Sequence, residues 1–132
     1  MELVNLAILF RVINLYTHHA HNMVKGQTFF EDHEFFADLY EKADGFYDDI
    51  IERYIGTTGG DIKLTHILSE AYKVIAKADD DYFKTTQIFV EHAVKKLDAA
   101  VKMNFSEGTK NLLQGMSDDL EKTIYKLKRK NI

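Results

Sequence analysis

The chain has 132 residues, of which 45% are hydrophobic, and this size and composition are typical of one folded domain. It contains no cysteine, which excludes a disulfide framework, a thiolate metal site and a cysteine nucleophile. The formal net charge of -4 argues against a dedicated nucleic-acid module, and no apolar run is long enough to span a membrane. Because no signal peptide is visible, we expect a single domain over residues 1–132 that is located in the cytoplasm.

The first predicted helix runs from about Glu2 to Lys25, and Gly26 is a residue that commonly ends a helix. Its apolar residues form two stripes at helical spacing, one with Leu3, Leu6, Phe10 and Ile13 and the other with Ile8, Val12 and Leu15. A helix that is apolar on several sides is usually buried on several sides. In so short a chain, this pattern predicts burial against another subunit.

The second predicted helix begins at Thr28 and ends near Ile55, before Gly56. Thr28 and Glu31 have the spacing of a capping box, in which each side chain satisfies a free backbone N–H of the first turn. The stripe that predicts its buried face contains Phe36, Leu39, Tyr40, Ala43, Phe46, Tyr47, Ile50, Ile51 and Tyr54.

The remaining chain predicts two more long helices after a connection over residues 56–80, with a short helix around Thr65–Ala76. The third long helix begins near residues 79–81, and the fourth follows a break at residues 106–109. No segment has the pattern of a strand. A long connection can run back along the second helix, so the second and third helices are expected to be parallel. The predicted fold is therefore an all-α, ferritin-like four-helix bundle whose crossover carries a short extra helix.

Four side chains around the first helix break are candidate metal ligands: His21, His33, Asp48 and Glu52. Imidazole and carboxylate groups together form the ligand set of iron, manganese or zinc. At about 100° per residue, these groups of the second helix lie beside its buried stripe, so a second protein surface has to close such a site. The simpler interpretation, that each is an ordinary solvated side chain of a helix flank, remains open at this point.

The same segment resembles a known family, the Dps proteins, which are small ferritin-like proteins of starved bacteria. The resemblance is carried by His21-Asn22-Met23-Val24-Lys25-Gly26, Phe29-Phe30, His33, Phe36, Leu39-Tyr40, Asp48 and Glu52-Arg53, and it extends to Glu107-Gly108-Thr109 and Leu120-Glu121-Lys122.

Membership of this family implies a hollow shell of twelve identical subunits that binds ferrous iron at its two-fold interfaces. The iron is oxidised, often with hydrogen peroxide, and is stored as ferric mineral, which implies a role in oxidative stress. By this resemblance His21 and His33 bind metal together with Asp48 and Glu52 of the partner subunit.

The chain also departs from the family pattern. The carboxylate that the family carries one turn after the second histidine is replaced by Ala37, and the aromatic residue after the first histidine is replaced by Asn22. His18 and Asp44 are auxiliary candidates to supply the missing ligand. Loss of one oxygen ligand is expected to weaken iron binding or to change the preferred metal. The alternatives are a structural shell with an inactive site, or one that holds zinc or manganese.

A small basic cluster ends the chain, with Lys126, Lys128, Arg129 and Lys130. A solvated helix end that favours the helix dipole explains these charges. The other interpretation is weak contact with DNA phosphates, which twelve copies in one shell would strengthen through avidity.

Overall fold

The computed structural model describes residues 2–132, and these residues form five helices and no strand. The helices are α1 (Glu2–Met23), α2 (Phe29–Thr58), α3 (Leu64–Ile75), α4 (Tyr82–Val101) and α5 (Glu107–Lys130). The expected all-α architecture is confirmed. Across the same residues, no helix combines the length and the apolar character needed to cross a membrane.

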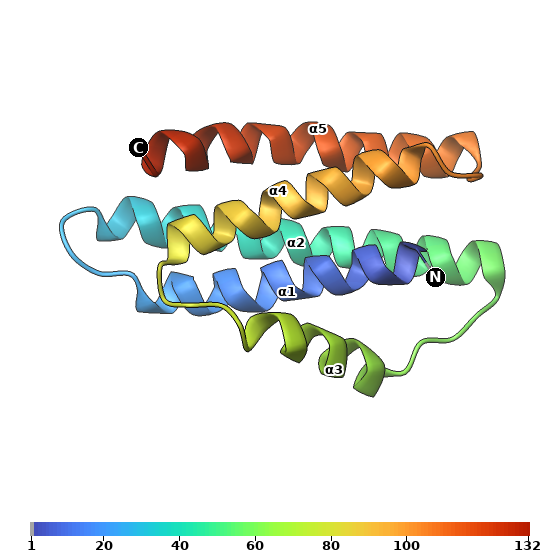
Figure 1. The fold of residues 1–132 in the computed structure, drawn as a ribbon, viewed down its shortest axis with the longest axis horizontal. Coiled ribbons are helices and arrows are strands. Elements are labelled where there is room, and N and C mark those ends of the chain that lie inside the picture. The colour runs from blue at the N-terminus through green and yellow to red at the C-terminus, as the bar shows by residue number, and fades with distance from the viewer. Residues whose placement is uncertain (1) are drawn as a thin grey trace.

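Four long helices form the bundle, and the short α3 lies outside it against α1 (Figure 1). α1 and α2 form one antiparallel hairpin, and α4 and α5 form the other. The chain leaves α2 at one end of the bundle and passes through α3 back to the opposite end, so α2 and α4 run in the same direction (Figure 1). The crossover topology predicted from the length of the middle connection is therefore correct.

The core lies between the two hairpins and is built from the predicted apolar stripes. Its members include the fully buried side chains of Phe10, Phe36, Ile50, Leu97, Leu113 and Leu120. The second stripe of α1 has a different environment from the one we expected. Val4 and Ile8 pack against Ile67 of α3, so the chain itself covers this part of α1 without a second subunit. Leu15 lies further along the same helix and keeps 40% of its surface exposed.

The capping box predicted at the start of α2 does not form. Thr28 is the residue before α2, but its side chain accepts no hydrogen bond from a free N–H of the first turn. Its hydroxyl instead donates to Oδ2 of the buried Asp32 at 2.7 Å, a hydrogen bond that the carboxylate charge strengthens. The other end of α2 also differs, since the helix continues through Gly56 to Thr58 and stops where Gly59 adopts a φ of 69°.

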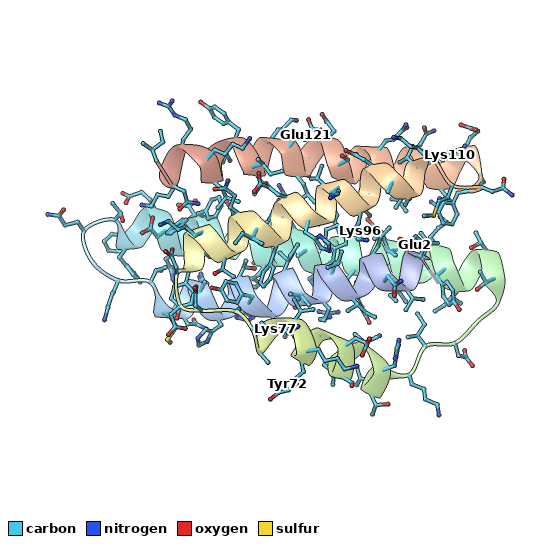
Figure 2. All side chains as sticks on the ribbon, viewed as in Figure 1. Glu2, Tyr72, Lys77, Lys96, Lys110 and Glu121 are labelled. Carbon is cyan, nitrogen blue, oxygen red and sulfur yellow. The ribbon has the colours of Figure 1, made fainter. Side chains whose placement is uncertain are left out.

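A cleft beneath α3 gives a prediction about pH. His92 of α4 lines this cleft together with Glu2, Glu70 and Lys96. Figure 2 labels Glu2 and Lys96. Burial lowers the pKa of His92 below its ordinary value of 6.5, and the charges of Lys96 and Lys95 lower it further.

Because the unfolded chain binds the His92 proton more tightly than the folded chain, His92 reduces stability as the pH falls through 6.5 and below. Urea unfolding of His92→Gln across this range is expected to show a shallower loss of stability than the parent protein. Equal slopes for the two proteins would contradict the assignment.

Candidate metal centre

His21 and His33 face each other across the turn between α1 and α2. Their ring centroids are 3.6 Å apart and the ring planes differ by 18°, so the two imidazoles are stacked. The His21 Nδ1 atom lies 2.7 Å from the carbonyl oxygen of His33, and the His33 Nδ1 atom lies 2.7 Å from the carbonyl oxygen of His21. Each histidine therefore holds the backbone of the other.

These reciprocal contacts determine which ring nitrogen is free. A carbonyl oxygen accepts hydrogen bonds and donates none, so each Nδ1 atom carries the hydrogen. In a neutral imidazole this leaves Nε2 with its lone pair, which is the arrangement seen in histidines that bind metals. Since the rings are nearly parallel, the two lone pairs do not converge on a single ion. As candidate ligands, His21 and His33 would therefore bind two separate ions.

The carboxylates lie far from this pair within one chain. Asp48 follows His33 by fifteen positions on α2, which corresponds to about 22 Å along the helix axis. Asp48 and Glu52 are exposed, one turn apart, and neither forms an ion pair with another residue of 2–132. Within these residues no three histidine or carboxylate side chains come close enough to hold one ion.

The family of the chain follows from a comparison with known proteins. Residues 4–130 match the model of the ferritin-like domain, which is nearly the whole length. The chain belongs to the ferritin-like family. A comparison with curated proteins gives no match.

Two solved structures show which branch of the ferritin-like family this fold resembles. The structure of Dps from Listeria innocua soaked with cobalt has a TM-score of 0.81 and 20% sequence identity, and the match covers 97% of this chain and 88% of that one. Dps from Mycobacterium smegmatis in its tetragonal form has a TM-score of 0.80 and 18% identity, with coverage of 96% and 82%. The predicted resemblance to Dps proteins is thereby confirmed for the fold.

His18 and Asp44, the auxiliary candidate metal ligands of this ferritin-like protein, contact other side chains. The carboxylate of Asp44 accepts a hydrogen bond from Arg11 Nη1 at 3.0 Å, and the Arg11 guanidinium also lies 3.8 Å from the centroid of the Tyr47 ring. The His18 ring stacks on Tyr40, with centroids 4.0 Å apart and planes within 7°.

Tyr40 contacts two of the candidate ligands, although the sequence pattern placed it only in the apolar stripe and in the family motif. Its ring lies against His18 and also approaches His21 edge-on, with centroids 5.4 Å apart. Tyr40 follows His33 by seven residues, which is two helical turns, so this spacing would have placed both on one side of α2. The pattern was hidden because the same residue also continues the apolar stripe.

The four basic residues considered for DNA contact do not form one surface. Lys130 pairs with the buried Asp32 at 3.3 Å and lies 4.8 Å from the centroid of Phe83, so it fastens the end of α5 to the bundle. Lys126 and Lys130 line one cavity together with Asp32 and Phe83. Lys128 instead faces the groove between α4 and α5. At about 100° per residue, residues 126 and 130 return to the same side of α5, whereas residue 128 lies on the opposite side.

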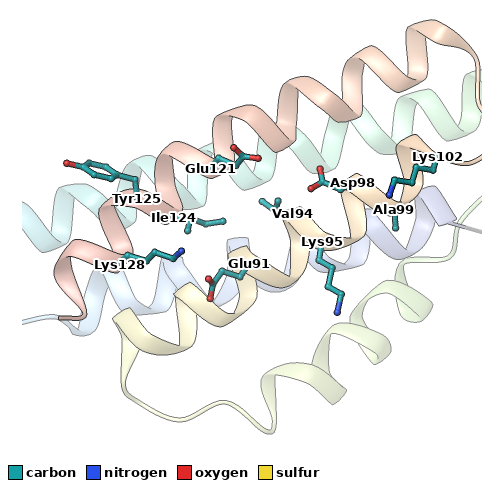
Figure 3. Close-up of a pocket in the computed structure, with 10 residues that line it drawn as sticks. All are labelled: Glu91, Val94, Lys95, Asp98, Ala99, Lys102, Glu121, Ile124, Tyr125 and Lys128. Atoms are coloured by element: carbon teal, nitrogen blue, oxygen red, sulfur yellow. The ribbon is translucent and has the colours of Figure 1, made fainter.

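The groove between α4 and α5 has a volume of about 850 Å³ (Figure 3). It is lined by Glu91, Val94, Lys95, Asp98, Ala99, Lys102, Glu121, Ile124, Tyr125 and Lys128. None of the predicted metal ligands is among them. The candidate centre therefore lies on the other hairpin, at α1 and α2.

Proposed function

We propose that this protein binds ferrous iron between two copies of the chain, oxidises it and stores the ferric product inside a hollow shell of twelve subunits. The observation that carries this proposal is the split ligand set. One end of the α1–α2 hairpin presents two Nε2 atoms, and the other part of α2 presents two unpaired carboxylates about 22 Å away. An antiparallel second copy brings the carboxylates of one chain to the histidines of the other.

Exposed apolar side chains support a second copy. Leu64, Leu68 and Tyr72 follow each other at four-residue spacing on α3 and expose 64%, 46% and 70% of their surfaces. Tyr72 points away from the bundle (Figure 2). Ile55, which is 45% exposed, follows the carboxylates on α2. An apolar stripe of this kind marks an interaction surface on a protein that works as an assembly.

In this proposal iron transfers the electron, and the protein side chains hold the iron in place. Ferrous iron supplies the electron, and hydrogen peroxide or oxygen accepts it. The Nε2 atoms of His21 and His33 bind the metal substrate, while their Nδ1 contacts fix the ring orientation. Asp48 and Glu52 of the partner subunit compensate the positive charge, which favours the ferric product. Zinc and manganese accept the same ligand types and would occupy the site as competitors.

The ligand set fits iron at His21 better than at His33. His33 has Ala37 one turn along α2, where a methyl group replaces the carboxylate of the family pattern. With the two rings stacked, His33 cannot share the ion at His21. The protein is therefore expected to bind one iron firmly and a second iron weakly.

Mixing the metal-free oligomer with ferrous iron and peroxide tests the proposal. Ferric absorbance should rise faster than in buffer without protein, and bound iron should exceed the number of sites once mineral forms. The Asp48→Asn variant should lose the fast phase, whereas Asp118→Asn, which changes an exposed carboxylate of α5, should keep it. Equal rates for parent protein and buffer would refute iron oxidation.

Replacing Ala37 by aspartate is expected to create the missing oxygen ligand. The variant should bind a second ferrous ion per site more tightly than the parent, because a carboxylate joins His33. Isothermal titration of both proteins with ferrous iron under anaerobic conditions measures this. Identical stoichiometry and affinity would mean that position 37 does not face the metal. Asp38→Ala is the control, since its exposed side chain lies about 100° away on the helix.

A second candidate function is a cytoplasmic shell that protects or associates with DNA without oxidising iron, and Ala37 is the observation that favours it. Such a protein would contain little iron after purification, or zinc or manganese instead. Metal analysis, together with a gel shift at low and physiological salt, separates the two functions.

A further inference from the structure

Asp32 is a buried charged side chain that the proposed iron chemistry does not use. It lies in the first turn of α2, directly before His33, and keeps only 9% of its surface exposed. Both carboxylate oxygens have partners, since Oδ2 accepts from the Thr28 hydroxyl at 2.7 Å and Oδ1 accepts from Lys130 Nζ at 3.3 Å. Because an unpaired carboxylate is unstable away from water, Asp32 holds the Lys130 ammonium in place.

The partner of Asp32 comes from the far end of the chain and is itself fixed. Lys130 is the last residue of α5, 98 positions after Asp32, and its ammonium lies 4.8 Å from the centroid of the Phe83 ring of α4. The next residue, Asn131, donates from Nδ2 to the Phe83 carbonyl oxygen at 3.0 Å and to Gln87 Oε1 at 2.8 Å. The end of α5 is therefore anchored on α4, and Lys130 connects it to the first turn of α2.

This first turn forms part of the candidate metal centre. The Phe29 ring stacks on the His33 ring, with centroids 4.9 Å apart and planes within 25°. The His33 carbonyl oxygen lies 2.7 Å from His21 Nδ1, so the same stretch of backbone also orients His21. Asp32 holds the start of the turn twice, because its N–H donates to the Thr28 carbonyl oxygen at 3.0 Å and its carboxylate accepts from the Thr28 hydroxyl. Movement of Asp32 would therefore displace both candidate ligands.

We propose that Lys130 is a positioning residue for the histidine ligands, a role that rests on the proposed iron binding. Lys130 holds Asp32, Asp32 holds the first turn of α2, and this turn fixes His33 and His21. The end of α5 thus orders the metal centre from outside it. Because the Lys130 side chain contacts neither histidine, its loss should weaken ferrous binding and leave the oxidation rate of bound iron nearly unchanged.

Lys126 provides a matched control for this role. It precedes Lys130 by about one turn of α5 and lines the same cavity beside Asp32 and Phe83. From Glu2 to the end of the chain, however, no carboxylate forms an ion pair with it. Lys126→Met and Lys130→Met remove the same charge from the same cavity, so a difference between them reports on the contacts of Lys130.

Hydrogen–deuterium exchange of the metal-free oligomer tests the connection without iron. The backbone amides of Val24, Phe29 and Asp32 form hydrogen bonds within the α1–α2 turn. In Lys130→Met, amides of residues 24–33 should exchange faster than in the parent protein, because local opening of this turn becomes easier. Lys126→Met and Lys130→Arg, which keeps the positive charge, should match the parent. Unchanged exchange in Lys130→Met, or equally fast exchange in Lys130→Arg, would overturn the role of the Lys130 charge.

Anaerobic titration with ferrous iron then measures the effect on the metal centre. Lys130→Met should bind iron about tenfold more weakly, within the range found when a group that orients a metal ligand is lost. At saturating iron, oxidation by peroxide should proceed at nearly the parental rate. Parental affinity in Lys130→Met would overturn the positioning role and leave the proposed function intact. Absence of iron binding by the parent protein would overturn both.

A double variant separates positioning from stability. Lys130→Met leaves the buried Asp32 without its cation, which destabilises the fold, whereas Asp32→Leu/Lys130→Met removes the buried charge together with its partner. We expect the double variant to unfold at a higher temperature than Lys130→Met and still to bind iron as weakly. If the double variant regains the parental affinity, the unpaired charge caused the loss and Lys130 does not position the ligands.

Discussion

Replacing His21 by alanine is expected to reduce the rate of ferrous iron oxidation about a hundredfold, because it removes the nitrogen ligand of the firmly bound iron. The stacked partner cannot substitute for it. His33 loses the stacked ring and the contact between its carbonyl oxygen and the His21 ring, although its own Nδ1 keeps the carbonyl oxygen of residue 21. Stopped-flow absorbance with ferrous iron and peroxide measures the rate.

The matched control for this variant is His66→Ala. His66 is also a histidine on a helix, but its side chain is exposed on α3, away from the α1–α2 turn. The His66→Ala variant should oxidise iron at the parental rate. If His21→Ala keeps the parental rate while its thermal unfolding is unchanged, the assignment of the iron ligand is wrong.

Replacing Phe36 by alanine is expected to lower the free energy of unfolding by about 3–5 kcal/mol, the range for removing a buried phenylalanine ring. Phe36 is 0% exposed, and its ring lies 5.3 Å from that of Phe35 and 4.8 Å from that of Phe83, measured between centroids. The variant leaves a cavity between α2 and α4, where the Phe36 ring packs in the parent protein. Urea unfolding of the protein at constant subunit concentration measures the change, since assembly contributes to stability.

Phe30 of the same helix provides the comparison. It is 80% exposed, so Phe30→Ala should change the unfolding free energy by less than about 0.5 kcal/mol in the isolated chain. A similar loss for both variants would show that Phe30 is buried in the assembled protein. A small effect for Phe36→Ala would contradict the described core.

The fold was accessible from the sequence because long helices leave clear periodic patterns. Phe36, Leu39, Ala43 and Ile50 were placed in the buried stripe of α2, and all four are buried. The crossover followed from the length of the middle connection alone. The capping box was wrong for a local reason, since the Thr28 side chain is oriented by its hydrogen bond to Asp32, which the motif does not describe.

The candidate site was accessible only in part. Residue types and spacing indicated His21 and His33, but their reciprocal backbone contacts depend on how the α1–α2 turn folds, which no spacing rule describes. The pairing of Asp44 with Arg11 has the same origin, because the two residues are 33 positions apart and meet only through helix packing. Tyr40 was assigned to the core because its position continues the apolar stripe of α2 and also lies two turns after His33.

Sharing of the site between two chains is tested most directly by complementation. His21→Ala and Asp48→Ala chains are co-expressed with different affinity tags, and shells that contain both are purified. If histidine and carboxylate come from different chains, a mixed pair of subunits contains one intact site. Random pairing in equal amounts then restores about a quarter of the parental rate, although each variant alone is inactive. Mixed shells that remain as inactive as either variant alone would contradict a site shared between subunits.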